Sequence, residues 1–194
     1  MKKTVRDIDW AGKTAVVRCD FNVPFVDGKI SDETRIVAAL PTIDYLRENG
    51  AKVVLLSHLG RPKGEPKPEF SLAPVAERLG EKLGTAVSFI PSDSVVDGSV
   101  YEAVSSLAAS DVALLENVRY RSEETKNDPE FARALAALGD VFVQDAFGTA
   151  HRAHASTTGI TDYIPAVSGF LIERELKFLG SAIESPKRPL AAIM

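Results

Sequence analysis

Cysteine is nearly absent from this chain, which has only Cys19 among its 194 residues. An internal disulfide is therefore impossible. Because Cys19 follows an apolar run, we predict that it is a small core residue rather than a reactive thiol. A chain without a disulfide framework fits a reducing compartment, and we expect a cytoplasmic protein.

Long apolar runs and excess positive charge are also missing. No stretch approaches the ~20 residues of a membrane-spanning helix, and the start, MKKTVRD, has no apolar region of signal-peptide type. The 27 acidic and 23 basic residues leave a net charge of −4, which argues against a general nucleic-acid binder. We expect no membrane or nucleic-acid partner, and any cationic site must be a local patch on an acidic body.

Familiar nucleotide and metal motifs are missing as well. Gly12-Lys13-Thr14 ends like a phosphate-binding loop, but Asp7 occupies the position of its first glycine and the segment leads into a strand. No G-x-G-x-x-G fingerprint occurs. His151 and His154 lie three residues apart without a supporting ligand cluster, so we predict no metal site. We expect one of them in an anion site and the other packed or hydrogen-bonded.

Short apolar runs alternate with helix-like segments along the chain. We predict strands over residues 14–17, 52–56, 87–90, 112–115, 141–143 and 190–193. This alternation predicts right-handed crossovers and one α/β domain, a three-layer αβα Rossmann-like fold with a six-stranded parallel sheet. The last strand stops without a cap or tail, so we expect the chain to be cut from something longer.

The segments between the strands show helix signals. A helix that Ser31 or Asp32 can cap runs toward Asn49-Gly50, and Pro41 is expected to restart it as a second helix. Further helices are predicted over residues 71–83, 100–107, 129–138 and 168–183. The 63–68 segment, rich in Pro, Gly and Lys, is predicted to be a surface loop.

Four of the predicted strands run directly into polar, mostly basic clusters. These clusters cover residues 18–24, 57–62, 116–119 and 144–152. Because the carboxyl ends of parallel strands meet at one edge of a sheet, the four clusters should lie together. The sequence therefore predicts an anion site at this edge.

The basic residues of these clusters differ from ordinary surface charge. Arg35, Arg61, Arg119 and Arg152 each lie in or near a loop after a strand, beside Gly, Asn or His. Guanidinium groups bind phosphate or carboxylate through two parallel hydrogen bonds, so we predict a phosphorylated ligand. By contrast, we interpret Arg121, Lys126 and Arg133 as solvated surface charges.

Asp20 and Asn22 lie two residues apart at a strand end, so their side chains point the same way. They suit hydrogen bonds to a ligand hydroxyl, although an Asx turn before Pro24 would also explain them. No Ser-His-Asp or Cys-His arrangement stands out. The chemistry expected here is positioning and charge stabilisation, as phosphoryl transfer requires.

The clusters resemble the motifs of the phosphoglycerate kinase family. The matching segments, in order, are VVRCDFNVP from Val16, SHLGRP from Ser57, LENVR from Leu115 and DAFGTAHRAH from Asp145. The resemblance covers the whole chain. Gln144 replaces the usual Asn and Tyr120-Arg121 a more typical aromatic pair, and neither falls on a ligand position of that family.

The resemblance implies roles for particular residues. Asp20 and Asn22 would hold the glycerate hydroxyl, and Arg35, as the catalytic residue, would stabilise the transferred phosphoryl group. The remaining substrate-binding residues, grouped around the non-transferred phosphate, would be His58, Leu59, Gly60, Arg61, Arg119, His151 and Arg152.

The resemblance also implies the parent protein. Residues 1–194 would form the N-terminal domain, which binds 3-phosphoglycerate or 1,3-bisphosphoglycerate in a monomeric glycolytic kinase. The absent C-terminal domain would bind Mg-ADP or Mg-ATP, so the chain alone should be inactive. A returning C-terminal segment would also be absent, leaving apolar surface exposed. A non-catalytic phosphoglycerate-binding module and a structural domain without a ligand remain alternatives.

Overall fold

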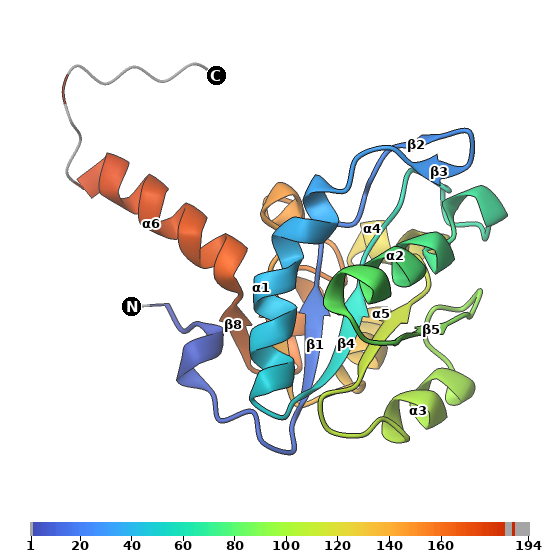
Figure 1. Ribbon diagram of the computed structural model, residues 1–194, viewed down its shortest axis with the longest axis horizontal. Helices are drawn as coiled ribbons and strands as arrows, with labels where there is room; N and C mark the ends of the chain where they lie inside the picture. Colours follow the sequence, from blue (N-terminus) through green and yellow to red (C-terminus); the bar gives the residue numbers. More distant parts are fainter. Residues whose placement is uncertain (1, 185–187, 189–194) are drawn as a thin grey trace.

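A six-stranded sheet runs through the computed structural model, which describes residues 2–184 and 188. Its strands are β1 (Thr14–Arg18), β4 (Lys52–Leu56), β5 (Val87–Ile90), β6 (Val112–Leu115), β7 (Val141–Gln144) and β8 (Ala166–Ser168). Within the described residues the order is β5-β6-β4-β1-β7-β8, and every neighbouring pair is parallel (Figure 1). The predicted αβα architecture with a six-stranded parallel sheet is confirmed.

The sixth strand is not the predicted one. The strand predicted at 190–193 lies outside the described residues, and β8 completes the sheet instead. The residues just before and just after β8 also form hydrogen bonds with β7: Phe142 N–H donates to Pro165 O (2.8 Å), and Gly169 N–H donates to Gln144 O (2.9 Å). Ser168, the predicted start of a helix, is therefore the last residue of this strand.

The described part of the chain contains six α-helices. They are α1 (Thr34–Glu48), α2 (Ala73–Leu83), α3 (Gly98–Ser105), α4 (Ser122–Lys126), α5 (Pro129–Ala136) and α6 (Phe170–Glu184). A separate hairpin pairs β2 (Phe25–Val26) with β3 (Lys29–Ile30). Short 3-10 turns include η3 (Val118–Tyr120) and η4 (Phe147–Thr149). No helix among the described residues is long and apolar enough to span a membrane.

Pro41 does not divide the first helix, contrary to the prediction. α1 continues through it as one helix of 15 residues. The ring removes only the hydrogen bond that Val37 O would accept, and Val37 and Pro41 both lie on the exposed side of the helix. On the opposite side Ile36, Ile43 and Leu46 are fully buried, and each such side chain contributes about 1.5–3 kcal/mol.

Alternate residues of the strands face two separate cores. Val17 and Leu55 pack in the core beneath α1 and α2, which lie in front of the strands in Figure 1. Val16 and Val54 face the opposite core, which contains residues of α3 and α5. Cys19 is 1% exposed within the first core, which confirms its prediction as a core residue.

α6 extends away from the rest of the domain (Figure 1). Several of its large apolar side chains are exposed, among them Leu179 (49%) and Ile183 (79%). The expectation of exposed apolar surface is therefore confirmed for this helix.

Candidate anion-binding site

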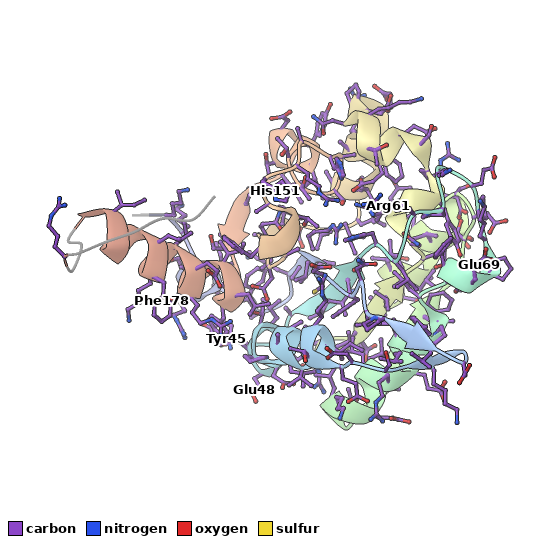
Figure 2. All side chains as sticks on the ribbon, turned by 90° about the horizontal axis from the view of Figure 1, so that it is seen from above. Tyr45, Glu48, Arg61, Glu69, His151 and Phe178 are labelled. Atoms are coloured by element: carbon purple, nitrogen blue, oxygen red, sulfur yellow. The ribbon has the colours of Figure 1, made fainter. Side chains whose placement is uncertain are left out.

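The four polar clusters follow four adjacent strands, β6, β4, β1 and β7. These strands point upward in Figure 1, so Figure 2 looks down onto their carboxyl ends. Arg61 and His151, labelled in Figure 2, lie on loops at this edge. The predicted convergence of the clusters is confirmed.

A cavity of about 530 Å³ opens at this edge. Three of the predicted arginines line it: Arg61, Arg119 and Arg152. Its other lining residues, none of them acidic, are Lys63, Gly64, Arg121, Ser122, Thr125, Lys126 and His154. Such a concentration of positive charge in a concave surface favours a small anion.

Two residues of this lining correct the sequence analysis. Arg121 and Lys126, interpreted as ordinary solvated charges, both line the cavity. They do so because η3 and α4, which follow β6 along the chain, supply part of the lining of this cavity. Arg121 is paired with Glu123 at 2.6 Å, so part of its charge is already compensated. Arg133 is a surface residue, as predicted, and pairs with Glu130 at 3.3 Å.

Arg119 is held in place by the backbone of the neighbouring cluster. Asn117 donates to Leu59 O (2.7 Å) and Phe70 O (2.9 Å) and accepts the Arg119 backbone N–H (3.0 Å). Arg119 Nη1 donates to Gly60 O at 2.8 Å. Its Nε–H is buried and has no hydrogen-bond partner within the described residues. A buried donor of this kind is costly until an acceptor binds.

Burial lowers the pKa of the Arg119 guanidinium, and the nearby charges of Arg152, Arg18 and Arg61 lower it further. The cations of the cavity therefore repel one another. A bound anion would relieve this repulsion, which is the electrostatic signature of an anion site.

Asp20 combines two interactions. Its Oδ1 accepts the Asn22 backbone N–H at 3.3 Å, which is the Asx-turn contact left open above. Its Oδ2 pairs with Arg35 Nη1 at 2.5 Å, and the Arg35 side chain is half exposed. Asn22 Oδ1 in turn accepts the Gly60 backbone N–H at 2.8 Å. The carboxylate therefore supports the loop and also orients Arg35.

The predicted residues divide between two cavities. Asp20 and Arg35 line a second, smaller one of about 190 Å³, together with Asp145, Phe147 and Gly148. His58 lies close enough to Arg119, Arg152 and Arg35 for their charges to lower its pKa, so it connects the two groups. His151 is exposed, and Arg152 Nε lies 3.4 Å from its Nε2.

Arg18 lies buried behind the site, and the sequence analysis placed it in the first cluster without giving it a role. It ends β1 and is only 1% exposed. Its guanidinium donates to Ser156 Oγ (2.8 Å), to Cys19 O and to His58 Nδ1 (3.1 Å). A basic residue directly after a buried apolar run was the available signal, because an arginine at that position needs acceptors inside the protein.

His58 is neutral in this structure. Burial, followed by the charges of Arg18 and Arg119, lowers its pKa from 6.5 to about 2. Because an arginine can only donate, His58 Nδ1 must accept from Arg18, and the ring proton lies on Nε2. Any hydrogen bond that His58 donates from Nε2 is therefore given by a neutral ring rather than by a cation.

An open parallel sheet covered by helices, with arginines and a histidine gathered at its carboxyl edge, defines an α/β domain with a candidate anion site. Comparison with known proteins identifies the family. The phosphoglycerate kinase family model matches residues 5–194, and the chain belongs to that family.

The chain resembles phosphoglycerate kinases from several organisms. It is 61% identical to one from Clostridium botulinum and 59% identical to one from Clostridium perfringens, covering all of this chain and 49% of each relative. The solved phosphoglycerate kinase of Coxiella burnetii superposes with a TM-score of 0.87 at 40% identity, over 97% of this chain and 47% of that one. The chain thus spans about half the length of the curated relatives it matches.

Proposed function

We propose that this chain is the substrate-binding N-terminal half of a phosphoglycerate kinase. The parent enzyme transfers a phosphoryl group from 1,3-bisphosphoglycerate to ADP, giving 3-phosphoglycerate and ATP in glycolysis. The observation that carries the proposal is the cavity lined by Arg61, Arg119 and Arg152, in which the buried Arg119 Nε–H lacks an acceptor within the described residues. We further propose a monomeric, cytoplasmic protein.

The cavity would take the non-transferred phosphate. Arg61, Arg119 and Arg152 would provide charge-assisted hydrogen bonds to its oxygens, and His58 would donate from Nε2. Gly60 holds Arg119 and Asn22 through its backbone, and Leu59 O accepts from the side chain of Asn117. The exposed His151 would close over the bound ligand from its position beside Arg152.

The second cavity would face the reacting end of the substrate. Asp20 and Asn22 would bind the glycerate hydroxyl, and Arg35 would stabilise the charge that develops on the transferred phosphoryl group. Arg35 is suited to this role because it is half exposed and held by one carboxylate, so it can turn toward the substrate. The chain's own contribution to the reaction is therefore orientation and charge stabilisation.

The Mg-nucleotide of the family belongs, in this proposal, to the half of the relatives that the chain does not span. It would supply the phosphoryl acceptor and the charge of the metal. No group of three or more His, Cys, Asp or Glu side chains suited to a metal occurs among the described residues. With half of the charge-stabilising groups elsewhere, this chain alone should bind substrate without turnover.

Calorimetry with 3-phosphoglycerate tests the proposal. We expect the wild-type chain to bind, and Arg61→Ala and Arg152→Ala each to weaken binding about ten- to a hundredfold, from the roughly 1.5–3 kcal/mol of a charged hydrogen bond. Arg133→Ala, which removes an arginine outside the cavity, should bind like the wild type. Absence of wild-type binding at millimolar ligand, or unchanged binding in both cavity variants, would refute the proposal. Kinase turnover by the chain alone would contradict its proposed dependence on the other half.

A further inference from the structure

A buried glutamate lies behind the anion site. Glu124 of α4 has no exposed side-chain surface. Its Oε2 accepts the Ser156 backbone N–H (2.9 Å) and its Oε1 accepts the Ser156 hydroxyl (2.7 Å). The Glu124 backbone O also accepts the Ala155 N–H at 2.9 Å. One residue thus holds the segment that follows the β7 cluster through both its side chain and its backbone.

The direction of the hydrogen bonds leading from Glu124 is determined by the chemistry of the groups. A carboxylate can only accept, so the Ser156 hydroxyl must give its single proton to Glu124. Ser156 Oγ then accepts from Arg18 Nε at 2.8 Å. The other side of the Arg18 guanidinium donates to His58 Nδ1 at 3.1 Å. The four side chains form one chain of bonds, all buried, that ends at His58.

By charge alone, Glu124 opposes the binding of an anion. It lies near Arg18 and Arg119, whose positive charges it offsets, and near His154, whose Nδ1 is 3.6 Å from Oε1. A carboxylate behind a phosphate site repels the phosphate. A favourable effect of Glu124 on binding must therefore come through geometry, and the two effects have opposite signs.

We propose that Glu124 is a positioning residue which, through Ser156 and Arg18, holds His58 as the tautomer that carries its proton on Nε2. In this form His58 presents an N–H donor to a phosphate oxygen. Without the Glu124 carboxylate, the Ser156 hydroxyl no longer has to donate to Glu124 and can turn its proton toward Arg18. Arg18 can then turn away from His58, and the ring is free to place its proton on Nδ1. This inference rests on the proposed function for its ligand, although the tautomer itself does not depend on a ligand.

Two adjacent glutamates of α4 provide a matched pair of variants. Glu124→Gln removes the buried carboxylate, and Glu123→Gln removes the same charge one residue away, at the Glu123–Arg121 pair outside the chain of bonds. Charge removal alone would tighten 3-phosphoglycerate binding in both variants. We expect unchanged or tighter binding in Glu123→Gln but about tenfold weaker binding in Glu124→Gln, measured by calorimetry.

Nitrogen-15 NMR of the imidazoles reads the tautomer directly, and with three histidines in the chain the His58 signals can be assigned by a His58→Gln variant. We expect His58 to be protonated on Nε2 in the ligand-free wild type and in Glu123→Gln, and to show Nδ1 protonation in Glu124→Gln. A general loss of stability would not move this signal. Ser156→Ala, which breaks the same chain of bonds without changing charge, gives a second test if Glu124→Gln does not fold.

The proposal is refuted if Glu124→Gln binds as tightly as Glu123→Gln, or if His58 keeps its proton on Nε2 in both Glu124→Gln and Ser156→Ala. Failure of the wild type to bind 3-phosphoglycerate would instead refute the proposed function. The ligand-free NMR comparison would still decide whether Glu124 controls the tautomer.

Discussion

Asp145 provides a sharp test of the electrostatics at the sheet edge. It follows β7, is 1% exposed, and its Oδ1 accepts the Leu171 backbone N–H at 2.9 Å in the first turn of α6. Burial raises its pKa from 3.8 to about 6, although hydrogen bonds from Thr42, Leu171 and Ile172 oppose the shift. We predict that Asp145→Asn, which keeps an acceptor for Leu171, removes a pH dependence of stability.

The sign and size of the effect follow from proton linkage. The folded state binds the Asp145 proton more tightly than the unfolded state, so stability falls as pH rises from about 4 to 6 and then levels off. A shift of about two pKa units corresponds to about 3 kcal/mol. About half of this stabilisation has already been lost when the pH reaches 5. The remaining part, about 1.4 kcal/mol, is lost between pH 5 and pH 7.5.

Urea unfolding followed by circular dichroism measures this difference. The stability of Asp145→Asn relative to the wild type should increase by about 1.4 kcal/mol from pH 5 to pH 7.5. Asp97→Asn is a control that should show no change between these pH values, because hydrogen bonds from Ser92 and Ser99 lower the Asp97 pKa to about 2 and the group stays ionised throughout this range. If the difference between Asp145→Asn and the wild type is the same at both pH values, the argument about this carboxyl group is wrong.

Three further predictions concern His58, a glycine beside the site and a glycine at the opposite end of the sheet. The folded-state pKa of His58 is lowered to about 2, so the unfolded state takes up a proton below pH 6.5 that the folded state does not. The wild type should therefore lose about 2 kcal/mol of stability between pH 7.5 and pH 5 through this group. Urea unfolding of His58→Gln should lack this loss, and an equal loss in that variant would refute the conclusion that folded His58 stays neutral. In Gly148→Ala the new Cβ would lie 2.9 Å from Asp20 Oδ2, so calorimetry should show weaker ligand binding with a nearly unchanged melting temperature. In Gly139→Ala the Cβ would lie 2.7 Å from Thr14 O in the strand backbone, so the free energy of unfolding should fall by about 1–3 kcal/mol. A destabilised Gly148→Ala together with a stable Gly139→Ala that binds more weakly would contradict both predictions.

The central sheet could be predicted from the sequence because its strands are buried on both faces. Runs such as Val53–Leu56 are continuously apolar and end abruptly in polar residues, so both the strands and their carboxyl ends are visible locally. The meeting of the four clusters then follows from parallel topology alone. β8 could not be found this way, since three residues at a sheet edge produce no recognisable run.

The errors at Pro41, Arg18 and Arg121 have a common cause. In each case the environment of the residue is set by parts of the chain that are distant in sequence, and not by its neighbours along the chain. Pro41 lies on the solvent side of a helix held by its buried face, and Arg18 is satisfied by Ser156 and His58, which are distant in sequence. Arg121 lines the cavity from the junction of η3 and α4, together with residues of other loops that are distant in sequence. Such contacts are not visible in a local pattern.

The position of β1 in the sheet constrains the order in which the domain can form. β1 is an inner strand that lies between β4 and β7, and Thr14 bonds to Asp140, 126 residues later in the chain. During synthesis, one edge of this apolar strand stays unpaired until the ribosome has released more than two thirds of the domain. Contacts of such long sequence separation slow folding. The nascent chain should therefore depend on protection of this edge from aggregation until β7 emerges.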